Sequence, residues 1–166
     1  MQLSIPTING TLAATYSKQA AVAQTYKGHP IISFPVDISD VPAGTHSLAF
    51  TFVDHDAIPV GGFTWIHWIA ANLPANTTHI PENASQTGAI PMVQGNNSTA
   101  GAYVHETDPK VSQHYVGPYP PDKDHRYSFK LFALDTELDL QPGYWLNEFH
   151  AVSYTHLRAH ETRHDL

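Results

Sequence analysis

The chain has 166 residues, 42% of them hydrophobic, which suits a single domain with a packed core. Its 15 acidic and 8 basic residues give a formal charge of −7, which disfavours nucleic acid and anionic membrane surfaces as broad partners because both require clustered Lys and Arg. It contains no Cys, which excludes disulfides, thiolate nucleophiles and cysteine zinc sites.

The N-terminal residues do not resemble a targeting segment. MQLSIPTINGTLAATYSKQ lacks the basic start and apolar run of a signal peptide. No stretch of the chain approaches the ~18 apolar residues of a membrane span. These features predict a soluble, cytoplasmic protein without a membrane-spanning segment.

Four short runs rich in β-branched and aromatic residues predict strands, each closed by Pro, Gly, Asn or Asp. They lie at residues 31–38, 46–54, 64–73 and 126–135. Pro35 demotes the first run to an edge strand or a bulge. In the second run large and small residues alternate, which predicts one face in the core, whereas the third is apolar on both faces, as in a strand covered on both sides.

The rest of the chain is predicted to be mostly irregular. Residues 84–115 are polar and rich in Gly and Asn, and a loop of that length is usually functional or mobile. One helix is predicted near residues 144–152. No internal repeat or linker marks a second domain, so residues 1–152 are predicted to form one domain.

The tail, SYTHLRAHETRHDL (153–166), differs from the chain before it. It is polar and has no consistent apolar stripe, so it is interpreted as a foreign-looking or artefactual segment that makes few contacts with the body. His156, His160 and His164 have i, i+4, i+8 spacing and would share one face of a helix, which is metal-ligand spacing. Because the segment has almost no apolar face to bury, an artefactual tail is favoured over a metal-binding helix.

Several polar residues outside the tail could carry chemistry: Asp54 and Asp56 after the second run, His67 inside the third, and His125 and Tyr127 at the start of the fourth. Together they could form a small polar pocket that grips a phosphate or similar oxyanion through His and Tyr donors, with a carboxylate fixing the histidine proton. Structural alternatives exist for each of them. His67 could be a hydrogen-bonded core residue, the two Asp could form Asx turns, and the prolines at 118–121 could simply make a turn.

Three segments carry a family resemblance: DHDAIP (54–59), WIHWIAANLP (65–74) and GPYPPDKDHRYSFKLFALD (117–135). In order and separation they resemble the signature blocks of the phosphatidylethanolamine-binding protein family, in particular its bacterial, Raf kinase inhibitor-like branch. The resemblance covers about residues 10–150. It implies a mostly β, sandwich-like fold with a large central sheet and few short helices.

The resemblance also implies a small anion pocket at one edge of that sheet. Its ligand-binding residues would be Asp54, His67, Pro120, His125 and Tyr127. Supporting positions would be Asp56, Pro59, Gly117 and Pro121.

The chain departs from the family pattern in two places. His55 replaces the first proline of the first block and Ile58 precedes Pro59, so the loop that bears Asp56 is expected to be set differently. The family continues past the helix near 144–152 into a closing strand. Here the tail stands in that position, and the closing strand is therefore predicted to be missing.

The favoured function is non-catalytic binding of a small anionic or phosphate-bearing ligand, because no G-x-S-x-G elbow, phosphate-cradling Gly-rich loop or H-E-x-x-H is present. No cofactor and no resident metal are expected. The alternative is a metal-assisted hydrolase that uses the Asp and His cluster. The resemblance also leaves open a regulator or inhibitor of a partner kinase or protease, and a homodimer. For a binding pocket we expect the histidine pKa to be raised by Asp54, and anion affinity to decline from pH 6 to pH 8.

Overall fold

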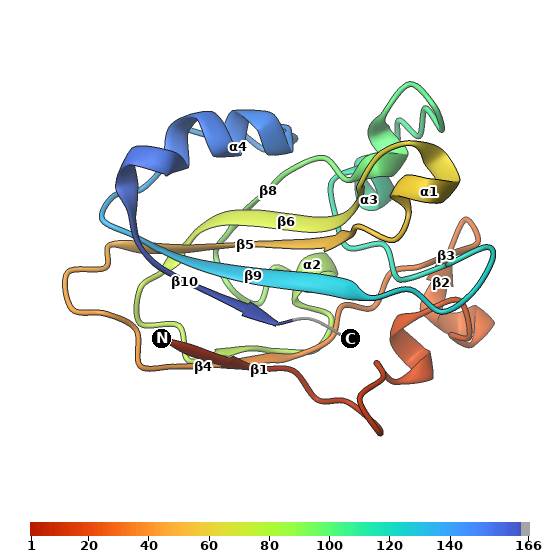
Figure 1. The fold of residues 1–166 in the computed structure, drawn as a ribbon, viewed down its shortest axis with the longest axis horizontal. Helices are drawn as coiled ribbons and strands as arrows, with labels where there is room; N and C mark the ends of the chain where they lie inside the picture. Colours follow the sequence, from red (N-terminus) through yellow and green to blue (C-terminus); the bar gives the residue numbers. More distant parts are fainter. Residues whose placement is uncertain (164–166) are drawn as a thin grey trace.

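A five-stranded antiparallel sheet is stacked on a three-stranded one, with α4 (Leu146–Ser153) on the outer face of the larger sheet (Figure 1). The structure is a computed structural model that describes residues 1–163, and side chains up to residue 160. Within these residues the larger sheet has the order β10–β9–β5–β6–β8 and the smaller has the order β1–β4–β7. The larger sheet comprises β5 (Ser47–Asp54), β6 (Trp65–Pro74), β8 (Val93–Gln94), β9 (Tyr127–Leu134) and β10 (Leu157–Arg163). The smaller comprises β1 (Gln2–Ser4), β4 (Val36–Ser39) and β7 (His79–Ile80).

An aromatic core lies between the two sheets. Phe34 packs edge-on against Phe52 with ring centroids 5.0 Å apart, and Phe50 stacks on Phe129 at the same separation. Large buried aromatics of this kind bury the most apolar area per residue and set the spacing of the layers. The mostly β, sandwich-like fold with a large central sheet is therefore confirmed.

A second apolar cluster covers the opposite face of the larger sheet. There Ala49, Ile69 and Leu134 of the sheet pack in one cluster with Phe149 of α4, and all four are buried. Because of this cover, every residue of β5 is buried. The predicted core face of this strand, with Leu48, Phe50 and Phe52, is confirmed, but the opposite face is buried as well, with Ala49 in the cluster that includes Phe149.

The strand predicted at 31–38 is shorter than expected. β4 begins at Val36, directly after Pro35, and lies between β1 and β7. The prediction of an edge strand or bulge was wrong because Pro35 precedes the strand and removes no hydrogen bond from it. The strands at β5, β6 and β9 and the helix at α4 agree with the predictions to within about two residues.

The prediction that the closing strand is missing was also wrong. β10 pairs antiparallel with β9, from Leu157 opposite Leu134 to Arg163 opposite Phe129, at the edge of the larger sheet (Figure 1). His156 and Arg158 form ion pairs with Asp135, and Ala159 packs against the aromatic core. The tail therefore makes extensive contacts through residue 163. His156 and His160 do not share a helical face, and His164 lies outside the described residues.

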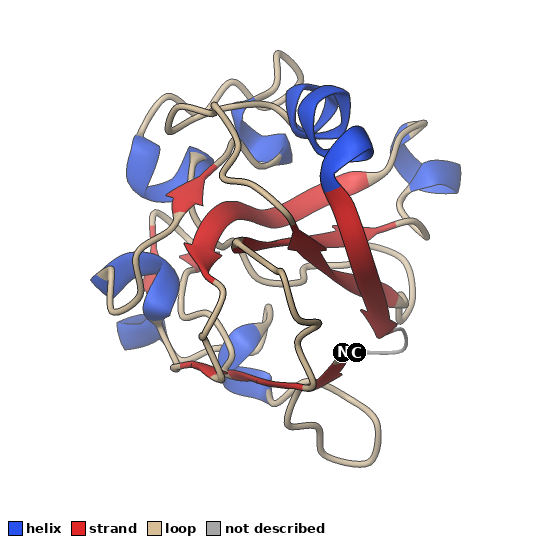
Figure 2. Cartoon of the chain, turned by 90° about the vertical axis from the view of Figure 1, so that its left-hand side faces the viewer, coloured by secondary structure: helices blue, strands red, loops and turns tan. Residues whose placement is uncertain are grey.

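The remaining elements are short and lie in the connections (Figure 2). They are the 3-10 helices η1 (Ala14–Tyr16), η2 (Val22–Gln24), η3 (Ser98–Ala100) and η4 (Tyr154–His156), the helices α1 (Ile58–Gly61), α2 (Ala84–Thr87) and α3 (Pro109–Ser112), and the hairpin of β2 (Thr25–Tyr26) and β3 (His29–Pro30). Residues 84–115 thus hold several short turns of helix and one short strand, in place of a continuous loop.

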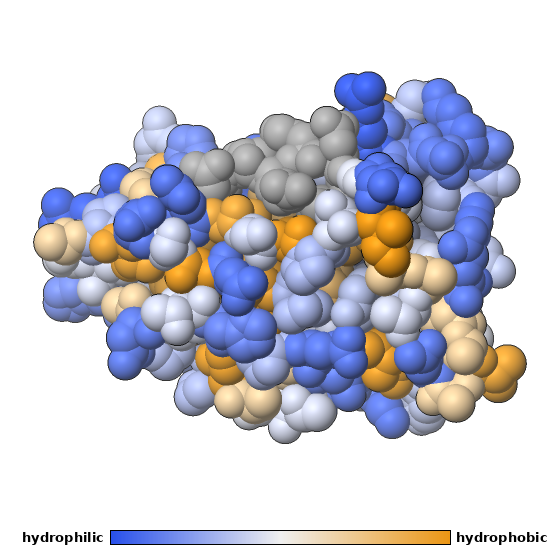
Figure 3. Space-filling view, turned by 90° about the horizontal axis from the view of Figure 1, so that it is seen from below, coloured by the Kyte–Doolittle hydropathy of each residue, from blue (hydrophilic) through white to orange (hydrophobic). Residues whose placement is uncertain are grey.

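The surface is mainly polar where it can be seen from the side of β1 and β4. Figure 3 shows hydrophilic residues over most of this face, with small separate apolar areas between them. None of the helices in residues 1–163 has the length and hydropathy needed to span a bilayer.

Candidate functional site

The three sequence segments meet because one strand ends where two others begin. Asp54 is the last residue of β5, and in the sheet register it lies opposite Trp65 at the start of β6 and Tyr127 at the start of β9. Antiparallel pairing therefore brings residues 54, 65 and 127 to the same end of the larger sheet (Figure 1). The convergence follows from strand register rather than from any local turn.

A β-bulge aims His67 toward this end of the sheet. Phe52 pairs with Trp68 and Val53 pairs with Ile66, so His67 has no partner on β5. An extra residue of this kind changes the direction of its side chain. The His67 ring lies against the rings of Phe52 and Tyr127, with centroid separations of 5.4 Å in both cases.

The backbone fixes the tautomer of His67. Its Nδ1 lies 2.7 Å from the Val116 carbonyl oxygen, which can only accept, so Nδ1 carries the proton and donates. The Val116 N–H in turn donates to the carbonyl of His67 at 3.1 Å. Burial lowers the pKa of His67 to about 4, so the ring is neutral near pH 7 and its Nε2 offers a lone pair.

His125 has the opposite character because it lies between two carboxylates. Its Nδ1 is 2.7 Å from Asp54 Oδ2 and its Nε2 is 2.8 Å from Asp122 Oδ1. Both ring nitrogens can donate only in the imidazolium form. Burial acts to lower the pKa of His125, but the hydrogen bonds to Asp54 and Asp122 outweigh it and the pKa is raised. The expected direction of the shift therefore holds for His125 and is reversed for His67.

Both Asp residues of the first segment also organise the loop that follows β5. Asp54 Oδ1 accepts from the Ala57 N–H at 3.1 Å, as the Asx-turn alternative predicts, while Oδ2 of the same side chain contacts His125. Asp56 Oδ2 accepts from the Arg126 N–H at 2.9 Å and so ties this loop to the start of β9. Pro59 lies in the first turn of α1 and is exposed.

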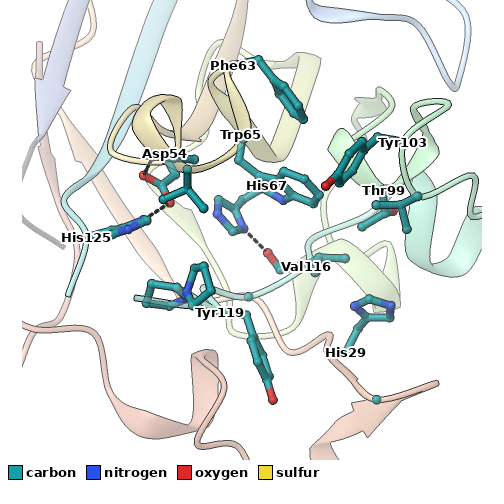
Figure 4. Close-up of a pocket in the computed structure, with 18 residues that line it drawn as sticks. His29, Asp54, Phe63, Trp65, His67, Thr99, Tyr103, Val116, Tyr119 and His125 are labelled. Carbon is teal, nitrogen blue, oxygen red and sulfur yellow. Dashed lines mark hydrogen bonds and ion pairs between the residues drawn. The ribbon is translucent and has the colours of Figure 1, made fainter. Parts of the chain in front are cut away.

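The side chains of Asp54, His67 and His125 line a cavity of about 440 Å³ (Figure 4). Asp54, His67 and His125 lie at its polar end. The strand-end loops, the β2–β3 hairpin and the segment after η3 supply the other walls, which are mainly apolar and aromatic. The remaining lining residues are Gly28, His29, Ala57, Val60, Gly61, Phe63, Trp65, Thr99, Tyr103, Val104, Val116, Gly117, Tyr119, Pro120 and Pro121.

The proline loop forms one wall of the cavity and is fastened to the N-terminal segment. The Gly117 N–H donates to Pro30 O at 2.8 Å, and Pro118 O accepts from the Lys18 N–H at 2.8 Å. Lys18 Nζ also donates to Pro120 O at 3.0 Å. A Cβ at residue 117 would collide with the Tyr16 carbonyl oxygen and with Pro30, so only glycine fits there.

Tyr127 does not line this cavity. It is buried behind His67 and borders a second depression on the other side of the proline loop. Its hydroxyl has no hydrogen-bond partner among the described residues. Burial, together with the negative charge of Asp54, raises the pKa of this phenol well above its ordinary value.

The sequence did not predict most of the cavity's apolar wall, nor its polar neighbours His29, Thr99 and Asp122. Phe63 stacks on Trp65 with centroids 5.9 Å apart and meets Tyr103 edge-on at 6.2 Å, forming an aromatic rim. Phe63 and Trp65 flank the start of a predicted strand and could have been noticed, whereas Tyr103 comes from the irregular 84–115 segment. Asp122 stands three residues before His125, and its pairing could not be inferred without knowing how the turn closes.

The Asp and His cluster does not have the form of a metal centre. In the part of the chain that the structure describes, no group of three or more His, Cys, Asp or Glu side chains is arranged to hold a metal ion. The four ring nitrogens of His67 and His125 include three that already have hydrogen-bond partners. The metal-assisted alternative therefore gains no support from the geometry.

The chain as a whole is similar to several known proteins. Residues 4–163 match the family described as phosphatidylethanolamine-binding protein, and the match extends through β10. The chain is 49% identical over 151 residues to the uncharacterized protein YxkA of Bacillus subtilis, covering 91% of this chain and 90% of that protein. It is 39% identical over 114 residues to a UPF0098 protein of Methanothermobacter thermautotrophicus, covering 68% and 66%.

Two solved structures are similar in fold. The crystal structure of CT736, a phosphatidylethanolamine-binding protein homologue from Chlamydia trachomatis, superposes with a TM-score of 0.73 at 30% identity, covering 92% of this chain and 86% of that one. The crystal structure of Escherichia coli YbcL, described as a member of the mammalian PEBP family, gives a TM-score of 0.77 at 24% identity, covering 98% and 94%. At 24% identity the second likeness supports the fold alone.

Proposed function

The chain belongs to the phosphatidylethanolamine-binding protein family, and from this premise we propose that its cavity binds a small anionic, phosphate-bearing ligand without chemical turnover. One observation carries the proposal: a buried imidazolium and a neutral imidazole with a free Nε2 converge at the polar end of one cavity. His125 supplies the positive charge and His67 supplies the free ring nitrogen.

The two histidines offer complementary groups to a phosphate. His125 is held as a cation by Asp54, so it contributes charge without needing a proton from the ligand. His67 Nε2 can accept a hydrogen bond from a protonated phosphate oxygen, or take up a proton and then donate. Phosphate binding is therefore coupled to proton uptake, and the affinity falls as the pH rises.

The size and lining of the cavity indicate a ligand larger than inorganic phosphate. A volume of about 440 Å³ falls in the range of sites that enclose whole small molecules. The rim of Phe63, Trp65 and Tyr103 would cover an apolar group attached to the anionic head. Tyr103 is 82% exposed, so this part of the rim is open to such a group.

Among the described residues that line the cavity, no nucleophile is paired with a base, which supports binding without catalysis. The Thr99 hydroxyl, in the cavity wall, donates to Asn97 Oδ1 at 2.6 Å and not to a histidine. Both nitrogens of His125 are engaged by carboxylates. Regulation or inhibition of a partner protein, which the family resemblance implies, stays a prediction.

Calorimetric titration with inorganic phosphate tests the proposal. Measurements at pH 7 in two buffers of different ionisation enthalpy report the protons taken up on binding, and we expect uptake that disappears in His67→Gln. Sulfate serves as a second probe because its charge does not change between pH 6 and pH 8, and its affinity should also decline across that range. His79→Gln is the matched control, since His79 is exposed and pairs with Asp37 away from the cavity. Absence of binding to either anion would overturn the proposal.

A further inference from the structure

A carboxylate of the chain itself already occupies the hydrogen-bonding position beside His125. Asp122 Oδ1 lies 2.8 Å from His125 Nε2, and Asp54 Oδ2 lies 2.7 Å from Nδ1. The imidazolium therefore has one carboxylate on each nitrogen. It has no ring N–H left for a ligand while Asp122 stays in place.

The charge balance of this group is unfavourable for an anion. Asp54, His125 and Asp122 together carry one net negative charge when His125 is protonated. No Lys or Arg lies among the described residues that line the cavity. An incoming anion must therefore either approach a negative cluster or displace one of its carboxylates.

The two carboxylates differ in how easily they can leave. The side chain of Asp54 is 6% exposed and also accepts from the Ala57 N–H, so it is fixed. The side chain of Asp122 is 47% exposed and sits in the turn after Pro121, where rotation would return it to water. The Asp122 end of this ion pair is therefore half exposed and can move into water, whereas the His125 end is buried and stays in place.

We propose that Asp122 is an intramolecular competitor that limits the affinity of the cavity for anions. Release of Asp122 leaves a neutral Asp54–His125 pair and frees the Nε2–H and the charge of the imidazolium for the bound anion. This inference rests on the proposed function, because it names the residue that sets the strength of the same binding.

A purely structural role predicts a different outcome. Asp122 precedes His125 by three residues, so their contact could serve only to close the turn. Asn at this position keeps an acceptor oxygen for the turn and removes the charge, whereas Ala removes both. A competitor predicts higher affinity in both variants, while a turn-closing residue predicts lower affinity, most of all in Ala.

The experiment is a set of titrations with inorganic phosphate on the full chain. The variants are Asp122→Asn, Asp122→Ala and Asp124→Asn. Asp124 is exposed in the same turn, and its change alters the net charge equally. We expect the phosphate Kd to fall by about three- to tenfold in both Asp122 variants, and by less than about twofold in Asp124→Asn.

Each result decides the inference. An unchanged or weaker affinity in the Asp122 variants, with phosphate still bound by the wild-type chain, overturns the competitor role and leaves the proposed function standing. An equal gain in Asp124→Asn overturns it as well, since the effect would then be general charge. If neither the wild-type chain nor any variant binds phosphate, the proposed function itself fails and the competitor role fails with it.

Discussion

At the scale of single residues, two histidines in one cavity have opposite protonation because their partners differ. His67 is buried and donates to a neutral carbonyl, and burial lowers its pKa to about 4. His125 is also buried, but two carboxylates raise its pKa. The cavity thus combines a histidine whose charged form is stabilised by two carboxylates with a neutral ring that can take up a proton.

Burial of neutral His67 should make the protein sensitive to acid. In the unfolded chain its pKa is near the ordinary 6.5 and in the folded chain it is about 4, so the unfolded state binds more protons between these values. Stability is therefore lost as pH falls from 6.5 to 4, by up to about 3 kcal/mol for this group.

Chemical denaturation at pH 7 and pH 4.5 checks this expectation. His67→Gln should lose less free energy of unfolding between the two pH values than the wild-type chain does. His79→Gln should behave like the wild type, because His79 is exposed on β7. Equal losses in the wild type and in His67→Gln would show that His67 is protonated in the folded chain.

At the scale of elements, the proline loop is a wall fixed at several points and not a free turn. Gly117 binds Pro30, Val116 binds His67, and Lys18 holds both Pro118 and Pro120. The prolines restrict the backbone φ angles of the loop, and the hydrogen bonds fix its position. The loop is therefore hydrogen-bonded to the N-terminal segment and to β6, and it leads directly into β9.

Gly117→Ala should disrupt this wall. Its new Cβ would collide with the Tyr16 carbonyl oxygen, which belongs to the backbone and cannot rotate away. We expect a loss of about 1–3 kcal/mol in the free energy of unfolding, together with weaker phosphate binding. Gly61→Ala is the control because it also lines the cavity, but its Cβ would meet Phe63 at an ordinary 3.6 Å. Wild-type stability in Gly117→Ala would refute the close approach.

β10 is the other element whose role can be tested. Its inward side carries Ala159, which packs against the aromatic core, while His160 is exposed. Ala159→Asp should place an unpaired charge against the core and lower the melting temperature by about 5 °C or more. His160→Asp, next to it on the same strand, should have little effect. Equal melting temperatures for the two variants would mean that β10 does not pack as described.

At the scale of the whole molecule, the sequence predicted the strands that have a long apolar run. It did not predict burial that depends on packing between elements far apart in the chain. β6 and β9 were found because their apolar runs are long and bounded. The burial of both faces of β5 could not be predicted, since it depends on α4 packing from a distant part of the chain. β10 was missed because LRAHETR pairs mainly through its backbone, which leaves little apolar signal.

The candidate site divides in the same way. The three sequence segments identified Asp54, His67 and His125, and the structure brings them to one cavity. Their protonation states and the Asp122 contact depend on burial and turn geometry, which no spacing reveals. Tyr127 was predicted as a ligand-binding residue because it lies in the same segment as His125. Its side chain is buried behind the cavity wall instead.

The most direct test of the central claim is a crystal structure of this chain soaked with inorganic phosphate at a concentration that saturates binding in solution. We expect phosphate at the polar end of the cavity, with an oxygen within about 3 Å of His67 Nε2. We also expect the Asp54–His125 hydrogen bond to be kept. An empty cavity at that concentration, or phosphate bound only elsewhere on the surface, would contradict the claim that the two histidines form an anion site.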